Sequence, residues 1–253
     1  MIIKKSPDEI ERMREAGRVV RGVLKAIPGE LKPGIRTKQI DELVETLIRD
    51  AGCVPSFLGY RGFPASACIS LNEEIVHGIP GPRELREGDL VKIDVGAIHD
   101  GYHADSAWTF YVGEAPPPEV TRLMEATEAA LWAGIEQARP GNRIGDVSHA
   151  IQDVAEGAGF SVVREYVGHG VGRELHEDLQ VPNYGNPGRG PKLEEGMTLA
   201  LEPMVNAGDW RTEVLDDQWT VVTADRSLSA HYEHTIAVTS DEPIVLTTNA
   251  APS

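Results

Sequence analysis

A 22-residue segment occurs twice in this chain, 107 positions apart, and the repeat limits the folds that the sequence can adopt. The copies read LKPGIRTKQIDELVETLIRDAG at 31–52 and ARPGNRIGDVSHAIQDVAEGAG at 138–159, and a helical pattern precedes each. The aligned apolar positions are Ile40, Val44 and Leu47 in the first copy and Val147, Ile151 and Val154 in the second. Two similarly capped amphipathic helices could match by chance. The period is far longer than that of a solenoid repeat, so we expect a duplication with halves of roughly 1–111 and 112–248. A pseudo-twofold axis would relate them, with a ligand site between them.

The amino-acid composition limits the partners and the cellular compartment that we expect for this protein. A formal charge of −16 argues against a nucleic-acid partner, which would need basic patches. Two cysteines, Cys53 and Cys68, cannot build a disulfide framework, and this suits a reducing compartment. The N-terminus lacks a signal-like apolar run, and no run approaches the roughly 18 residues of a membrane helix. We expect an acidic, soluble, cytoplasmic protein.

Capping and turn residues divide the chain into helices and strands. Ser6-Pro7-Asp8-Glu9 predicts a capping box that opens a helix, and Lys32-Pro33-Gly34 ends it. Thr37 is expected to cap a second helix that Gly52 ends. Strands are expected over about 67–76, 91–110 and 197–205, and residues 219–239 read as a hairpin.

The segment 91–110 predicts a hairpin that carries two aspartates on one face. Asp100-Gly101 suits a type I′ turn, in which both central residues have positive φ. His99 would then pair with Tyr102, and Asp94 would lie opposite Ala107. Asp105 would share a face with Asp94 as a diagonal neighbour, roughly 7–8 Å away or less at Cβ. A cation or an arginine between the carboxylates would offset their repulsion; a solvated hairpin with two surface aspartates is the alternative.

Three further residues occupy unusual contexts. His169 lies among glycines in YVGHGVGRELHE, and Glu202 and Glu233 interrupt the apolar strands MTLALEPMV and AHYEHTIAVT. Each alone has an ordinary interpretation, as a loop histidine or as an edge-strand glutamate. Together with the two aspartates they give one imidazole and four carboxylates. This set would suit two divalent cations such as Mn²⁺, Fe²⁺ or Co²⁺, with Zn²⁺ as a further candidate.

These segments carry a family resemblance over nearly the whole chain. The motifs are VHGIP, KIDVGAIHDGYHADSAWTF, GHGVGRELHE, LEPMV and HYEHTIAV. The sequence resembles the methionine aminopeptidase family, which implies the α+β pita-bread fold with two pseudo-twofold halves around a dinuclear metal site. It also implies one catalytic domain over 1–253. The implied metal ligands are Asp94, Asp105, His169, Glu202 and Glu233.

The resemblance implies roles for residues beyond the ligands. His77 would bond near the scissile amide nitrogen, His176 would stabilise the oxyanion, and Glu202 would shuttle the proton. The methionine pocket would be formed by Tyr60, Phe63, Cys68 and Trp219. Leu175 falls where some members of the family have phenylalanine, so the resemblance does not assign the residue that forms this wall of the pocket. His231 and His234 are given no metal role. The histidines expected to be exposed are His99, His103 and His149.

The implied function is removal of the initiator methionine when the second residue is small, by attack of a metal-bridging hydroxide. Only 30 residues separate Glu202 from Glu233, which leaves no room for the helical insertion of type II enzymes and indicates type I. The resemblance further implies a cytoplasmic monomer that meets the N-terminal methionine of nascent polypeptides near the ribosome exit. The alternatives are a metal-free binding module on the same fold and a prolidase or creatinase activity.

Overall fold

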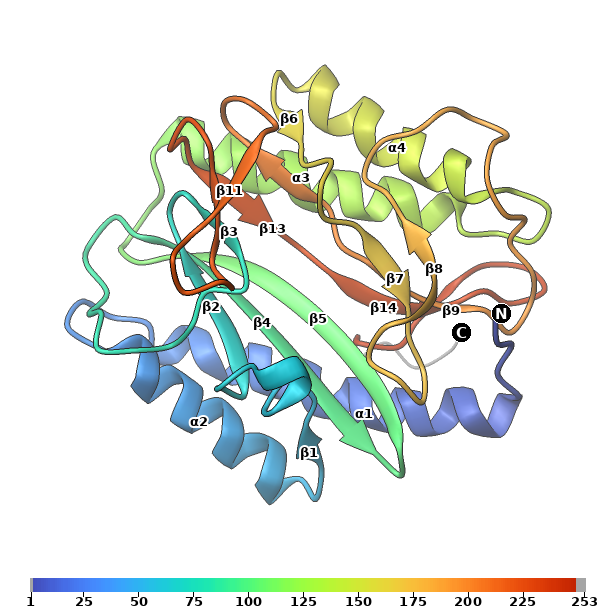
Figure 1. Cartoon of the computed structure of the whole chain (residues 1–253), viewed down its shortest axis with the longest axis horizontal. Coiled ribbons are helices and arrows are strands. Elements are labelled where there is room, and N and C mark those ends of the chain that lie inside the picture. The colour runs from blue at the N-terminus through green and yellow to red at the C-terminus, as the bar shows by residue number, and fades with distance from the viewer. Residues whose placement is uncertain (1, 249–253) are drawn as a thin grey trace.

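The computed structural model describes residues 2–248, which form four helices and many short antiparallel strands (Figure 1). The helices are α1 (Pro7–Ala26), α2 (Thr37–Asp50), α3 (Pro118–Gln137) and α4 (Ile144–Gly157), with 3₁₀ turns η1 (Ile27–Gly29) and η2 (Tyr60–Gly62). Helices α1 and α3 each have 20 residues, and α2 and α4 each have 14. The sequence repeat is therefore visible as a repeated pair of helices.

The helix starts confirm one capping prediction and correct another. Ser6 caps α1 in a complete capping box with Glu9. The N-cap of α2 is Arg36 and not Thr37. Thr37 is the first helical residue, and its hydroxyl donates to the Gly81 carbonyl at 3.1 Å. The corresponding N-cap of α4 is Arg143, whose backbone N–H, like that of Arg36, donates to the side chain three residues later.

Fifteen strands, all paired antiparallel, complete the described chain. They are β1 (Val54–Pro55), β2 (Ala67–Leu71), β3 (Glu74–Val76), β4 (Leu90–His99), β5 (Tyr102–Tyr111), β6 (Ser161–Val162), β7 (Gly168–Gly170), β8 (Glu177–Val181), β9 (Thr198–Leu201), β10 (Met204–Asn206), β11 (Thr212–Val214), β12 (Val221–Thr223), β13 (Ser229–His231), β14 (His234–Ala237) and β15 (Ile244–Val245). Strand β4 pairs with β1, β2 and β5, and a five-stranded sheet has the order β15-β14-β9-β7-β8. Two three-stranded sheets have the orders β13-β10-β6 and β11-β12-β3.

The β4–β5 hairpin confirms the predicted register. His99 pairs with Tyr102 and Asp94 with Ala107. Asp100 and Gly101 have φ values of 47° and 78°, as a type I′ turn requires. Because side chains alternate along a strand, this register places both aspartates on one face of the hairpin.

Two strand predictions are wrong in detail. The segment 67–76 is split at Asn72, whose φ of 54° ends β2 before β3 begins. The segment 219–239 is not a hairpin, because each of its three strands pairs with strands outside the segment. Strand β12 pairs with β11 and β3, β13 with β10, and β14 with β9 and β15. Sequence alternation identifies strands but does not choose such partners.

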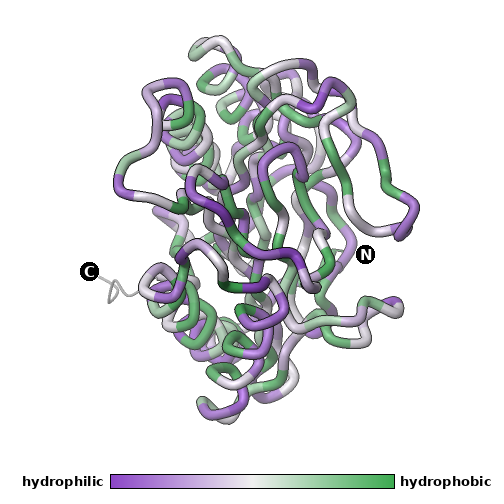
Figure 2. The backbone as a smooth tube through the Cα atoms, turned by 90° about the vertical axis from the view of Figure 1, so that its left-hand side faces the viewer, coloured by the Kyte–Doolittle hydropathy of each residue, from purple (hydrophilic) through white to green (hydrophobic). Residues whose placement is uncertain are grey.

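The helices cover one side of the strands, and the two aspartates of the β4–β5 hairpin lie on the other side. Figure 2 shows the two helix pairs one above the other on the same side of the strands. Val91, Ile93 and Val95 of β4 are buried in a core with residues of α1 and α2. The intervening Asp94 therefore points away from these helices. Among residues 2–248, no helix is long and apolar enough to cross a membrane.

Two glycines of α1 test how closely this helix packs. A Cβ at Gly17 would lie 2.2 Å from the Leu246 carbonyl oxygen, whereas a Cβ at Gly22 would have nothing within 4 Å. We expect Gly17→Ala to lower the free energy of unfolding by about 1–3 kcal/mol through overpacking. Gly22→Ala should raise it by about 0.5–1 kcal/mol through helix propensity. Urea unfolding of both variants measures this, and equal effects would contradict the packing argument.

Candidate metal centre and adjoining pocket

The five residues expected as ligands line one cavity of about 130 Å³. Asp94 and Asp105 come from the β4–β5 hairpin and His169 from β7. Glu202 lies between β9 and β10, and Glu233 lies between β13 and β14. Each carboxylate is thus carried by a strand or by the short break between two strands, so the sheets and not flexible loops set its position.

Hydrogen bonds fasten the hairpin to the strands that carry Glu233. The Asp105 N–H donates to Thr235 Oγ1 at 2.9 Å, and that hydroxyl donates to the Asp105 carbonyl at 2.8 Å. The Glu233 N–H donates to the Ala107 carbonyl at 2.8 Å, and Ser106 Oγ donates to the Glu233 carbonyl at 2.6 Å. These bonds connect segments about 130 residues apart and hold Asp105 and Glu233 on facing walls.

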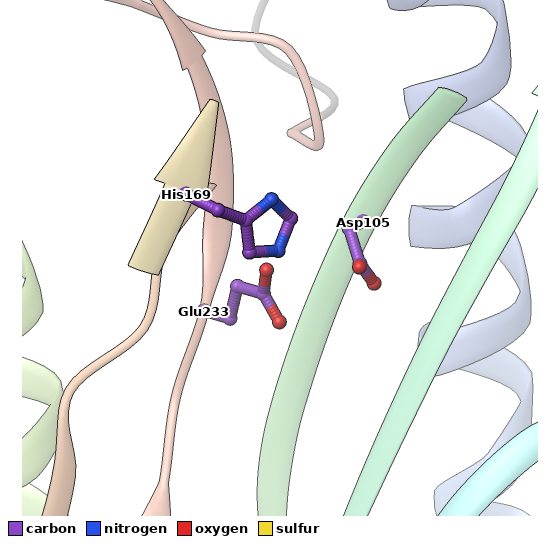
Figure 3. Close-up of side chains that lie close together, drawn as sticks. All are labelled: Asp105, His169 and Glu233. Carbon is purple, nitrogen blue, oxygen red and sulfur yellow. The ribbon is translucent and has the colours of Figure 1, made fainter. Parts of the chain in front are cut away.

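The imidazole of His169 points into the same space. Figure 3 shows Asp105, His169 and Glu233 directed toward one another from three different elements. One ligand atom from each lies within 4.8 Å of the other two. His169 Nδ1 pairs with the Gly170 carbonyl at 2.9 Å, which leaves Nε2 facing Glu202 Oε1 at 3.5 Å. A histidine ligand fixed through its other nitrogen is the usual arrangement in metal sites.

Burial and mutual repulsion shift the titration of this cluster. Burial raises the pKa of Asp94 to about 7. Burial and then the neighbouring carboxylates raise the pKa values of Asp105, Glu202 and Glu233 well above their usual range. Burial also lowers the pKa of His169 to about 4, so its imidazole is neutral at pH 7.

The donor set fits divalent cations. One carboxylate oxygen each of Asp94, Asp105 and Glu233 is buried without a hydrogen-bond partner. A buried carboxylate oxygen without a partner is costly unless a cation or donor meets it. Neutral imidazole and carboxylate oxygens are the ligands that divalent transition metals accept.

An apolar slot adjoins the cluster in the same cavity. Its lining includes the four residues expected to hold methionine, which are Tyr60, Phe63, Cys68 and Trp219. The rings of Phe63 and Trp219 meet edge to face with centroids 5.1 Å apart. Leu175 is buried in this cluster beside Phe57, so it supplies the wall that the sequence left open. Phe57 also lines the cavity but was not predicted from the sequence, because its segment has no periodic pattern to mark it.

Two neutral histidines flank the cluster. His77 and His176 both line the cavity, and burial lowers the pKa of His77 to about 4. His176 keeps one side exposed, and partial desolvation with the nearby His169 and Arg61 lowers its pKa to about 3. His176 Nδ1 pairs with the Tyr60 hydroxyl at 2.9 Å, and its ring centroid lies 4.1 Å from that of His169. His77 meets the Trp219 ring edge to face. Each imidazole can therefore offer a hydrogen bond without adding charge.

The remaining histidines include one wrong prediction. His103 was expected to be exposed but is only 9% exposed, and its Nδ1 pairs with Ser56 Oγ at 2.9 Å. It shares the inner face of β5 with Asp105, which explains the burial. His149 is exposed as predicted, and His99 is half-buried beside Cys53.

The two histidines that flank Glu233 in the sequence, neither predicted as a metal ligand, lie in different surroundings. His234 packs between Trp108 and Trp132, with Nδ1 on Thr247 Oγ1 at 2.8 Å. His231 lies nearer the cluster, with Nε2 3.7 Å from Glu202 Oε2 and 4.0 Å from Glu233 Oε2. A strand position two residues before Glu233 is the one sequence signal that could have indicated this closeness.

Comparisons with known proteins agree with this geometry. The profile of metallopeptidase family M24 matches residues 11–240. Methionine aminopeptidase 1 of Bacillus subtilis is 53% identical over 247 residues, which cover 98% of this chain and 99% of the relative. The crystal structure of methionine aminopeptidase from Rickettsia prowazekii is 41% identical with a TM-score of 0.96, covering 98% of this chain and 100% of that one. A prolidase from Pyrococcus furiosus, 23% identical with a TM-score of 0.78, shares the fold; 98% of this chain and 66% of the prolidase are covered.

The chain therefore belongs to metallopeptidase family M24 and, within it, is similar over its full length to methionine aminopeptidases. This confirms the resemblance and the α+β pita-bread fold expected from the sequence. Membership of the family also implies a divalent metal cofactor.

A carboxylate substitution tests the metal site. We expect Asp105→Asn to retain less Mn²⁺ after loading and gel filtration, because a neutral amide is a weaker ligand. Asp100→Asn, at the exposed hairpin tip of the same strand pair, should retain Mn²⁺ like the unsubstituted protein. Equal metal content in both variants would exclude Asp105 as a ligand.

The affinity of the site for Mn²⁺ should fall from pH 8 to pH 6, because carboxyls with raised pKa values take up protons that the cation must displace. Calorimetry in buffers of different ionisation enthalpy measures the protons released when Mn²⁺ binds.

Proposed function

We propose that this protein is a methionyl aminopeptidase that removes the N-terminal methionine of peptides. The observation that carries the proposal is a single cavity in which an apolar, aromatic-walled slot adjoins the cluster of carboxylates and imidazole. The named relatives support it, since the similar full-length proteins are methionine aminopeptidases. The prolidase likeness concerns the fold alone.

The metal would be held by the five residues inferred from the sequence. Asp94, Asp105, His169, Glu202 and Glu233 offer enough oxygen and nitrogen atoms for two divalent cations, with Mn, Fe, Co or Zn as candidates. When bound, a cation pair would activate a water for attack and polarise the carbonyl of the first peptide bond. The carboxylates would also place negative charge near the substrate's free α-amine.

The chain's own side chains would move the protons and stabilise charge. Glu202 would accept the proton of the attacking water and return it to the leaving amine. If the Tyr60 hydroxyl donates to His176 Nδ1, His176 keeps its proton on Nε2 and can donate it to the developing oxyanion. His77, which meets the Trp219 ring edge to face, would bond near the scissile nitrogen.

The slot would select the methionine side chain. An unbranched, flexible thioether can fill an irregular apolar pocket closed by aromatic rings. The preference for a small second residue follows from the family resemblance. We also propose the type I class, because only strands and turns lie between Glu202 and Glu233 in the described chain. One catalytic domain over the chain, a cytoplasmic monomer and nascent polypeptides as substrates complete the proposal.

Peptide specificity tests the slot. We expect the best kcat/KM for Met-Ala peptides and a poor value for Met-Phe. Leu-Ala should lose roughly 1–3 kcal/mol of transition-state binding, because a branched side chain fits the slot less well. Acetyl-Met-Ala should resist cleavage because it lacks a free amine. Equal kcat/KM values for Met-Ala and Leu-Ala would contradict the proposal that the slot selects methionine. Cleavage confined to bonds before proline would favour the prolidase alternative.

A histidine substitution tests the oxyanion donor. His176→Ala should lower kcat by about 10²–10³, the usual effect of losing one such donor, with unchanged metal content. Tyr60→Phe should lower kcat less, since it removes only the partner of Nδ1. His149→Ala, an exposed histidine on α4, should match the unsubstituted enzyme. Loss of bound metal in His176→Ala would instead make His176 a ligand.

A further inference from the structure

Lys5, in the N-terminal segment, contacts the end of the loop that carries the pocket residues Leu175 and His176. Lys5 Nζ pairs with the Glu177 carboxylate, and the two side chains are only 3% and 6% exposed. The neighbouring Lys4 pairs with Glu194, but both of those side chains are 52% exposed. Breaking a buried pair leaves a charge without its partner and without water, whereas an exposed pair contributes little.

Glu177, the first residue of β8, organises the loop 172–176 that precedes it. Its second carboxylate oxygen accepts the Arg173 N–H at 3.0 Å. The Gly172 N–H donates to the Glu174 carbonyl at 3.1 Å, and the Gly172 carbonyl accepts the His103 N–H at 2.8 Å. The Glu177 side chain therefore reaches back across the loop and closes it, and Leu175 and His176 are held between these two anchors.

Lys5 is itself fixed in place. Its backbone N–H donates to the Gly196 carbonyl at 2.7 Å, just before β9, and Nζ also donates to the Ile3 carbonyl at 3.2 Å. In Figure 1 the blue segment that leads into α1 accordingly passes close to β9. The loop and the ion pair are in close contact, because a Cβ at Gly172 would lie 2.4 Å from both Glu177 Oε1 and Lys5 Cε.

We propose that Lys5 and Glu177 are positioning residues that hold His176 and Leu175 against the substrate slot. The N-terminal segment thus sets the alignment of the oxyanion donor, although it does not line the cavity. This inference rests on the proposed aminopeptidase function. A displacement of about 1 Å at a reacting group can cost on the order of 10² in rate, so a loosened loop should act mainly on kcat.

Matched lysine substitutions test the proposal. Lys5→Met should lower kcat for a Met-Ala peptide by roughly 10- to 100-fold, with normal metal content. Lys4→Met, which removes the same charge from the exposed pair, should leave kcat unchanged. Lys5→Arg should recover part of the loss. The double variant Lys5→Met/Glu177→Gln should be less impaired than either single variant, because neither charge is then left unpaired.

A double-mutant cycle of Lys5 and His176, measured by kcat, distinguishes a positioning role of Lys5 from a general loss of stability. If Lys5 acts on kcat through His176, the kcat of Lys5→Met/His176→Ala should be no lower than that of His176→Ala alone. Multiplicative losses, or equal rates for Lys5→Met and Lys4→Met, would overturn the proposal.

Hydrogen exchange gives a readout that does not depend on activity. Exchange of the amides of residues 172–177 should be faster in Lys5→Met than in Lys4→Met, and unchanged exchange would overturn the positioning role. An unsubstituted enzyme that does not release methionine would contradict the proposed function, while faster loop exchange would still support the contact inferred here.

Discussion

The structure depends on burying several carboxylates side by side. Asp94, Asp105, Glu202 and Glu233 share one cavity, and within residues 2–248 only histidines come within ion-pair distance of them. Two unit charges 7 Å apart repel by about 2 kcal/mol at an effective dielectric constant of about 20. Such a cluster persists only where the surrounding structure fixes it, and bound cations would offset the repulsion. The bonds from Thr235 and Ser106 supply part of that fixation.

The repeated helix pairs provide the rigid support behind the cluster. Helices α1 and α2 cover the β4–β5 hairpin, while α3 and α4 enclose a second core with strands of the later half. Each carboxylate therefore lies on a strand, or directly beside one, whose residues are packed into an apolar core. A site built on such elements keeps its geometry better than one built on free loops.

The slot beside the cluster is assembled differently. Apart from Cys68 on β2, its walls come from the η2 turn and the residues beside it, from Trp219 before β12, and from the loop 172–176, none of which is a long regular element. These pieces need their own ties, such as the stacking of Tyr60 on His176 and the buried pair of Lys5 with Glu177. Strands and the short breaks between them thus carry the residues inferred to hold metal, and tethered loops carry most of those inferred to select the substrate.

The sequence alone determined features that depend on neighbours along the chain. The Asp100-Gly101 turn placed Asp94 and Asp105 on one face, and the repeat at 31–52 and 138–159 located the helix pairs. The motifs around His169, Glu202 and Glu233 were specific enough to indicate the family. Only the tertiary structure separated 219–239 into strands with distant partners, buried His103 beside Ser56, and brought Lys5 to Glu177. Turns and helix caps are decided by local backbone preferences, whereas these contacts join segments whose meeting is decided by the packing of whole sheet faces, which no local pattern records.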